Sequence, residues 1–166
     1  MTSDYLSANL YKYGSYIPYV GVSMKRVQIK EELCMGCGLC RVACQTEHSV
    51  SHDVIKAVKK ENQKPRIRVE RKGEISFSVP CRHCDEPWCA YSCISGAMTR
   101  DPITGIVSSD PERCIGCWTC IVACPNSALI KDKANHVILK CDLCGGKEIP
   151  ACVANCPNEA LELIDG

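Results

Sequence analysis

The sequence predicts a small α+β protein whose short hairpins and short helices are held around groups of cysteines. Sixteen of its 166 residues are cysteine and one is phenylalanine, so leucine, valine and isoleucine alone would make a thin interior. Turn signals also separate short alternating segments, which favours hairpins over long helices. The length suits one compact domain or two very small ones.

The cysteines form an internal repeat of four groups with none left over. Every group begins with C-x-x-C and ends with C-x-x-x-C. The groups are Cys34, Cys37, Cys40 and Cys44; Cys81, Cys84, Cys89 and Cys93; Cys114, Cys117, Cys120 and Cys124; and Cys141, Cys144, Cys152 and Cys156.

The segments around the later groups also repeat. ISGAM (94–98), PNSAL (125–129) and PNEAL (157–161) each follow the last cysteine of a group. We expect a short helical turn there, with its alanine packed inward. Residues 97–110 and 128–140 alternate around turn signals and are expected to form hairpins.

Residues 53–72 break the repeat and are interpreted as an insertion between the first two groups. The segment carries eight Lys or Arg against three acids. Its first part predicts a helix to about Gln63, which Pro65 ends, and RIRVE then resembles a strand. The basic surface is expected either to dock an acidic partner or simply to face solvent.

Dense cysteine indicates either disulfides in a secreted chain or metal ligation in a reducing compartment. The first residues show no export signal, and no stretch approaches the length of a membrane span. We therefore expect a cytoplasmic protein with metal-binding thiols. A processed secreted protein with disulfides is the alternative.

The third group and Pro125 match the run C-x₂-C-x₂-C-x₃-C-P in full. In that run three thiolates bind one [4Fe–4S] cluster and the fourth binds a second cluster. Pro125 would then open the next helix, and glycines such as Gly36, Gly38 and Gly116 would let backbone N–H groups approach sulfur. Sixteen thiolates account for four [4Fe–4S] clusters.

Two other metal sites compete with this interpretation. Zinc is usually bound by two separated C-x-x-C pairs, which leaves the third close cysteine of each group unexplained. The second gap is wider in the groups 81–93 and 141–156, so a [3Fe–4S] cluster at one of them stays open.

Four stretches carry a resemblance to a known family: CRHCDEPWC, CISGAMTRDPITGIV, CIGCWTCIVACP and KCDLCGGKEIPACVANCP. From about Val27 to Leu163 the chain resembles the four-cluster, ferredoxin-like electron-transfer subunits of multisubunit oxidoreductases. It looks most similar to the small iron–sulfur partner of carbon monoxide dehydrogenase. Gln45 departs from the pattern, since it stands where proline follows the first group.

The resemblance implies that the first group pairs with the fourth and the second with the third. A domain of residues 24–166 would then hold two ferredoxin-like modules, one from groups 34–44 and 141–156 and one from groups 81–93 and 114–124. The implied ligand sets are Cys34, Cys37, Cys40 and Cys156 (cluster one); Cys81, Cys84, Cys89 and Cys124 (cluster two); Cys114, Cys117, Cys120 and Cys93 (cluster three); and Cys141, Cys144, Cys152 and Cys44 (cluster four).

The function implied is a non-catalytic electron relay in an anaerobic oxidoreductase complex. Carbon monoxide dehydrogenase would donate electrons, and a flavoprotein or hydrogenase would accept them. The same role with a tungsten aldehyde oxidoreductase or a formate dehydrogenase–hydrogenase is the main alternative, and a zinc-stabilised interaction protein is a remote one. No nucleotide loop, flavin motif or nucleophile–base pair is visible, and no motif supports nucleic-acid binding.

Residues beside the ligands carry weaker signals. Trp88 and Trp118 lie inside cysteine loops, where they would shield clusters from water or simply pack the core. His83 lies between two cysteines, but the sixteen thiols already suffice as ligands. His48, His52 and His136 carry no signal.

Residues 1–23 hold five of the six tyrosines and precede the first ligand. Tyrosine is enriched at interfaces, so we expect an arm that binds a partner subunit. An extension without a role is the alternative.

Overall fold

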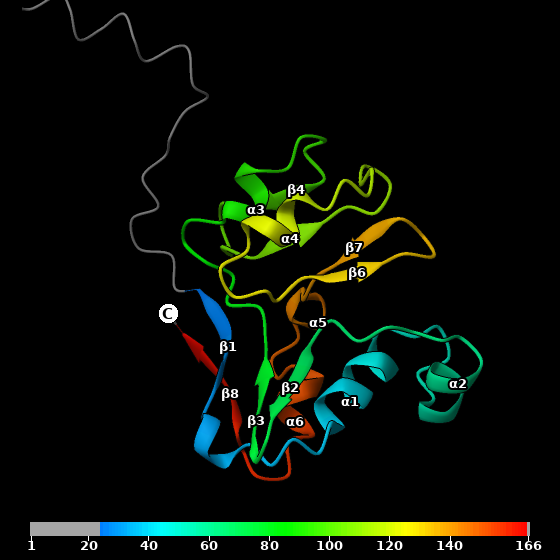
Figure 1. Cartoon of the computed structure of the whole chain (residues 1–166), viewed down its shortest axis with the longest axis vertical. Coiled ribbons are helices and arrows are strands. Elements are labelled where there is room, and N and C mark those ends of the chain that lie inside the picture. The colour runs from blue at the N-terminus through cyan, green and yellow to red at the C-terminus, as the bar shows by residue number, and fades with distance from the viewer. Residues whose placement is uncertain (1–23, 166) are drawn as a thin grey trace, which may run out of the picture.

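The computed structural model describes residues 24–165, so the tyrosine-rich segment 1–23 lies outside the described residues. Within them the chain is a mixture of short helices and short strands, which confirms the predicted fold class (Figure 1).

The strands of the described region form four separate antiparallel pairs and no larger sheet. Two pairs are the predicted hairpins. Strand β4 (Met98–Arg100) pairs with β5 (Val107–Ser109), and β6 (Ile130–Asp132) pairs with β7 (Val137–Leu139). Each hairpin therefore lies beside a cysteine group, as the turn signals indicate.

The other two pairs were not predicted. Strand β1 (Lys25–Ile29) pairs along its length with β8 (Leu161–Asp165), which joins the two ends of the described chain. Strand β2 (Arg68–Lys72) covers part of the expected RIRVE strand and pairs with β3 (Ile75–Val79). Pairing between distant segments leaves no local turn signal, so β1–β8 could not be read from periodicity.

The molecule has two halves, which Figure 1 shows one above the other. The lower half comes from both ends of the chain: β1, η1 (Glu31–Leu33), α1 (Leu39–Glu47), β2, β3, α6 (Ala151–Ala154) and β8, with α1 packed on α6. The upper half comes from the middle of the chain: α3 (Trp88–Tyr91), β4, β5, α4 (Thr119–Ala123), β6 and β7. Helix α5 (Leu143–Gly146) lies between them in this view.

Each half has its own buried core, and cysteines belong to both. The lower core combines apolar side chains with three cysteines: Val27, Ile67, Leu143, Leu161, Cys40, Cys44 and Cys152. The upper core is smaller: Met98, Val107, Leu129, Ile138 and Cys120. The thin apolar interior that the composition predicts is therefore observed.

The insertion forms a shorter helix than expected. Helix α2 (Val54–Lys59) begins where the Asp53 carboxylate accepts a hydrogen bond from the Lys56 N–H at 2.8 Å, and it ends before Gln63. The N–H of Gln63 turns back to the Ala57 carbonyl (2.9 Å). In Figure 1 this helix projects from the body.

Part of the basic charge of the insertion is used inside the molecule. Lys64 pairs with Asp132 of β6, and Arg66 pairs with Asp142, both at 2.5 Å. The segment is therefore not a simple solvated face: its second half ties α1 to the hairpin β6–β7 and to the fourth cysteine group.

The helical turn expected after the last cysteine is wrong. In groups two to four the third residue after that cysteine has positive φ, and its N–H donates to the cysteine carbonyl at 3.2 Å; these residues are Gly96, Ser127 and Glu159. The buried residues that follow are Ala97, Ala128 and Ala160, so the alanines do pack inward as predicted. The left-handed residue stops a helix, and a strand follows. Pro125 occupies the second position of such a turn, which its fixed φ suits.

Candidate metal centres

Each cysteine group begins with the same backbone reversal. The second residue after the first cysteine has positive φ in all four groups; these residues are Gly36, His83, Gly116 and Leu143. The reversal lets the first two cysteines of a group face one space. A Cβ at Gly116 would lie 2.5 Å from the His136 carbonyl oxygen, so glycine is required there by close approach as well as by φ.

A short helix carries the third cysteine of each group. The third cysteine is the second residue of its helix in every group: Cys40 in α1, Cys89 in α3, Cys120 in α4 and Cys152 in α6. The fourth cysteine follows four residues later, one turn along. The helix expected after the fourth cysteine is therefore wrong, since the helix begins before the third cysteine. The third and fourth thiols of a group therefore lie about one helical turn apart along the chain, which allows them to reach two neighbouring sites.

Three cavities are each lined by three cysteines of one group and one cysteine of another. Their cysteines are Cys34, Cys37, Cys40 and Cys156; Cys81, Cys84, Cys89 and Cys124; and Cys114, Cys117, Cys120 and Cys93. We call them sites one, two and three.

The remaining four cysteines also lie together. Burial raises the pKa of the Cys152 thiol, and the neighbouring Cys141, Cys44 and Cys144 raise it further. The backbone N–H of Arg66 donates to the Cys44 sulfur at 3.1 Å. We call these four cysteines site four.

The four sites are neighbours in one series. Cys40 of site one contributes to the raised pKa of Cys152, whose largest cause is burial. Burial raises the pKa of Cys141 in site four to about 12, and Cys81 of site two adds to it. Helix α4 carries Cys120 of site three and is followed directly by Cys124 of site two. The series therefore runs one, four, two, three.

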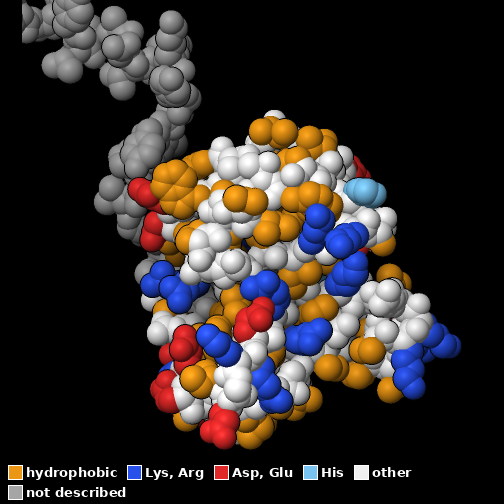
Figure 2. All heavy atoms as spheres, viewed as in Figure 1, with side chains coloured by type: hydrophobic (Ala, Val, Ile, Leu, Met, Phe, Trp, Pro, Cys, Tyr) orange, Lys and Arg blue, Asp and Glu red, His pale blue; other side chains and the backbone are white. Residues whose placement is uncertain are grey.

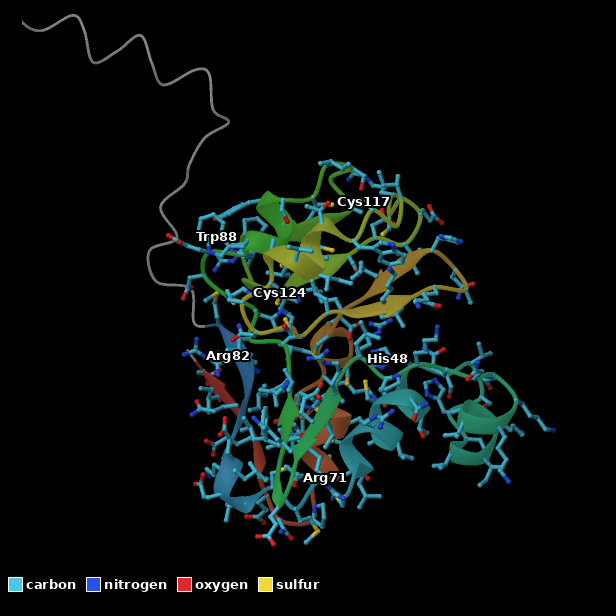
Figure 3. The ribbon with its side chains drawn as sticks, in the orientation of Figure 1. His48, Arg71, Arg82, Trp88, Cys117 and Cys124 are labelled. Carbon is cyan, nitrogen blue, oxygen red and sulfur yellow. The ribbon has the colours of Figure 1, made fainter. Side chains whose placement is uncertain are left out.

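Only the two end sites have an exposed cysteine. Cys37 of site one and Cys117 of site three are exposed, whereas the other fourteen are buried or half-buried. Figure 3 shows Cys117 near the top of the molecule, and the loop that carries Cys37 lies at the bottom of Figure 1.

The donor set fits an iron–sulfur cluster better than a single ion. Among residues 24–165, no three His, Cys, Asp or Glu side chains converge closely enough to hold one metal ion. The sulfurs of sites one to three instead surround a space. All sixteen cysteines are free thiols with no disulfide among them.

Metal binding at these sites must displace protons. Burial raises the pKa of Cys89 and of Cys120 to about 11 each. At neutral pH such thiols keep their protons until a metal replaces them. Besides the Arg66 N–H at Cys44, backbone N–H groups already point at two further sulfurs: Met98 donates to Cys93 at 3.4 Å and Ala151 to Cys144 at 3.5 Å. Hydrogen bonds of this kind help to set cluster potentials.

His83 is a buried, neutral residue of the wall of site two. It is 1% exposed, and its Nδ1 accepts a hydrogen bond from the Val107 N–H at 3.1 Å. Burial, helped by the charge of Lys140, lowers its pKa to about 3. Its hydrogen bond to the backbone supports the structural role over the ligand role that the sequence left as a weak alternative.

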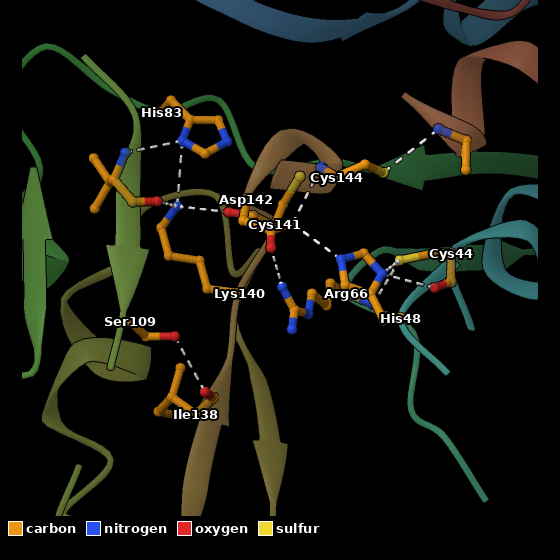
Figure 4. Close-up of polar contacts among 12 residues, drawn as sticks. Cys44, His48, Arg66, His83, Ser109, Ile138, Lys140, Cys141, Asp142 and Cys144 are labelled. Carbon is orange, nitrogen blue, oxygen red and sulfur yellow. Dashed lines mark hydrogen bonds and ion pairs between the residues drawn. The ribbon is translucent and has the colours of Figure 1, made fainter. Parts of the chain in front are cut away.

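A charged network beside site four has no signal in the sequence. His48 donates to the Cys44 carbonyl (2.8 Å) and to Asp142 (3.0 Å), and Arg66 binds the other oxygen of Asp142 (Figure 4). Burial opposes the charge of His48, yet Asp142 and Cys44 raise its pKa to about 10. Its partners come from sequence distances of up to 94 residues, so no local pattern reveals them.

Both tryptophans lie at cavity walls. Trp88 lines site two and Trp118 lines site three. Trp88 is 55% exposed and meets Tyr91 edge to face, so it covers site two from the solvent side. Trp118 is half-buried and packs against the upper core, and the Lys131 ammonium lies 4.2 Å from the centre of its ring, so the core-packing role applies to this residue.

Within residues 24–165 every helix is too short or too polar to cross a membrane.

The chain matches two family models. A 4Fe-4S dicluster domain model matches residues 74–165, and a 4Fe-4S binding domain model matches residues 27–47. The first range contains cysteine groups two, three and four, and the second contains group one.

Similar proteins include three from Escherichia coli (strain K12). Electron transport protein HydN is 39% identical over 150 residues, covering 80% of this chain and 83% of HydN. Protein NrfC is 36% identical over 143 residues, covering 79% and 60%. The putative oxidoreductase AegA is 34% identical over 146 residues, but the chain spans only 21% of its length.

Among solved structures, the active site complex BamBC of benzoyl coenzyme A reductase, in complex with benzoyl-CoA, contains a similar chain. The two are 25% identical with a TM-score of 0.48, and the match covers 86% of this chain and 80% of the other.

Proposed function

Because the chain belongs to the 4Fe-4S dicluster family of iron–sulfur proteins, we propose that it relays single electrons through four clusters and catalyses no reaction itself. Four [4Fe–4S] clusters account for all sixteen cysteines. HydN, to which it is 39% identical, is named as an electron transport protein. The observation that carries the proposal is the series of four cysteine sites with an exposed thiol at each end.

The proposed ligand sets are the four sites, which are also the sets implied by the resemblance to the four-cluster family. The crossed cavities support this assignment: Cys156 faces site one, Cys124 faces site two, and Cys93 faces site three. The two proposed modules correspond to the lower and upper halves of the fold. When bound, each cluster supplies one-electron redox chemistry, and the chain holds the clusters, shields them and spaces them.

Exposed apolar side chains at both ends support docking of redox partners there. Beside site one, Leu33, Met35 and Leu39 are exposed. Near site three, at the other end of the series, Ile115 and Val122 are exposed. Figure 2 shows hydrophobic side chains gathered over the upper end of the molecule. Exposed apolar patches mark interaction surfaces, so electrons would enter at one end and leave at the other.

Reductive titration tests the relay. The anaerobically purified protein is expected to take up about four electrons, one per cluster, with loss of visible absorbance as the clusters are reduced. A protein that binds zinc takes up none, because zinc has no redox chemistry. Iron and zinc content measured on the same sample complete the comparison, and a redox-silent zinc protein would overturn the proposal.

The partner is proposed from the resemblance alone. Carbon monoxide dehydrogenase as donor, with a flavoprotein or hydrogenase as acceptor, is favoured over aldehyde or formate oxidation. Such a complex would operate in the cytoplasm, where thiols stay reduced. The native complex can be purified and its catalytic metal identified. Nickel would support carbon monoxide dehydrogenase as the partner, and tungsten or molybdenum would support an aldehyde or formate oxidoreductase.

Residues 1–23 are proposed to dock the partner subunit. A chain beginning at Met24 is expected to keep its iron content and visible spectrum, because every cysteine lies downstream. It should co-purify less with the catalytic subunit, since buried aromatic residues dominate many interfaces. If the shortened chain loses its clusters, residues 1–23 are needed for folding. If it binds the catalytic subunit as well as the full chain does, residues 1–23 are an extension without a role.

A further inference from the structure

Lys140 is a lysine buried between two of the four cysteine sites. It follows β7, directly precedes Cys141 of site four, and is 3% exposed. Its ammonium donates to the Val107 carbonyl (2.6 Å) and the Cys141 carbonyl (3.3 Å), and it lies 3.5 Å from the neutral His83 Nδ1 (Figure 4). It also donates to the Cys81 sulfur at 3.1 Å. The carbonyls and the imidazole solvate the ammonium but do not neutralise it.

No carboxylate pairs with this ammonium among residues 24–165. Asp142 is two positions along the chain, but its two oxygens are engaged by His48 and Arg66. A buried charge is costly unless an opposite charge compensates it. The cysteine sulfurs are the anionic groups within reach, and Cys81 is in direct contact with the ammonium.

The contacts of Lys140 are unequal between the two sites. In site two the Lys140 ammonium touches the ligand sulfur of Cys81 at 3.1 Å. In site four it touches the backbone oxygen of Cys141. Site two therefore receives the larger share of the positive charge.

We propose that Lys140 is a positioning residue for electron transfer, whose fixed positive charge raises the reduction potential of the cluster at site two. This inference rests on the proposed function. An oxidised [4Fe–4S] core with four thiolates carries a formal charge of about −2, and reduction adds one more negative charge. A buried cation at the ligand sulfur stabilises the reduced form, because the low local dielectric screens it little.

With a raised reduction potential, the cluster at site two would be the one that holds the electron most of the time. Site two lies inside the series, between sites four and three, and its cysteines are buried or half-buried. A raised potential there favours an electron held at the junction of the two halves of the molecule, away from solvent.

The test is a potentiometric titration followed by electron paramagnetic resonance, on the holoprotein and on three variants. Lys140→Met removes the charge and keeps the length of the side chain, and Lys140→Arg keeps the charge. Lys133→Met removes the same charge from an exposed position in the turn of the same hairpin. The signal of site two is the one that Cys124→Ser alters.

Lys140→Met is expected to shift the reduction equilibrium of that signal at least tenfold towards the oxidised form, about 59 mV for one electron. Lys140→Arg should retain most of the potential, and Lys133→Met should change it little because exposed charges are screened. Equal titration curves for Lys140→Met and Lys133→Met would overturn the inference while leaving the relay intact. A wild-type protein with no reducible cluster would overturn the relay itself.

A comparison within the wild-type protein decides the matter if Lys140→Met assembles no clusters. The signal altered by Cys124→Ser, assigned to site two, should titrate at a higher potential than the signal altered by Cys156→Ser, assigned to site one. Site one has the Ser78 hydroxyl beside Cys40 at 3.4 Å rather than an ammonium. A site-two potential equal to or below that of site one would rule out the effect.

Discussion

Removal of iron from the holoprotein is expected to unfold most of residues 24–165. The four strand pairs are all two-stranded, and an isolated pair is marginally stable in water. Both cores include cysteines that the clusters would anchor, Cys40, Cys44 and Cys152 in the lower half and Cys120 in the upper. Metal binding supplies on the order of 10 kcal/mol in small metalloproteins, comparable with the whole stability of a typical domain, about 5–15 kcal/mol.

The measurement is far-ultraviolet circular dichroism and a proton–nitrogen NMR spectrum before and after anaerobic chelation with a thiol reductant present. We expect loss of most secondary structure and collapse of the amide dispersion. The same protein incubated without chelator is the control. A well-dispersed spectrum from the iron-free chain would show that the fold stands without its clusters.

Cys124→Ser is expected to damage the cluster of site two rather than the cluster of its own sequence group. Cys124 is the C-cap of α4 and lines the cavity of site two with Cys81, Cys84 and Cys89. A serine there removes one thiolate from site two and leaves the three neighbouring cysteines of its own group intact. The expected result is loss or conversion of one cluster of four.

Cys120→Ser is the matched control, because it changes the same residue type in the same helix. Cys120 faces the cavity of site three with Cys114, Cys117 and Cys93. Magnetic resonance and Mössbauer spectra of the two variants should therefore lose different clusters. Loss of the same signal in both variants would contradict the crossed ligation.

The cysteine spacing predicts more of the site than of the fold around it. C-x-x-C-x-x-C can be interpreted from sequence because ligand geometry demands close spacing, and the hairpins 97–110 and 128–140 carry local turn signals. The position of the helix was predicted wrongly because Pro125 suits the start of a helix and the second position of a turn equally well. Ser127 has a positive φ, which serine rarely adopts, and this backbone conformation makes the segment a turn and not the start of a helix.

Long-range contacts could not be predicted from the sequence. In the sequence Lys140 is one of many charged residues, with nothing to mark it as buried. Only the folded chain brings it to Cys81, 59 positions away. His48 and Asp142 are 94 residues apart. With one sequence and no local periodicity between such partners, neither the buried ammonium nor the charged network could be inferred.

The pairing of β1 with β8 bears on how the protein is made. The strands, helices and hairpins of the upper half come from one continuous stretch in the middle of the chain. The lower half closes only when Leu161–Asp165 reaches Lys25–Ile29, and Leu161–Asp165 is synthesised after the whole of the upper half. Domains fold as units during synthesis, so the upper half can take up iron on the nascent chain first. The lower half must wait for Leu161–Asp165, and a translation product that stops before this strand would carry a half-loaded protein.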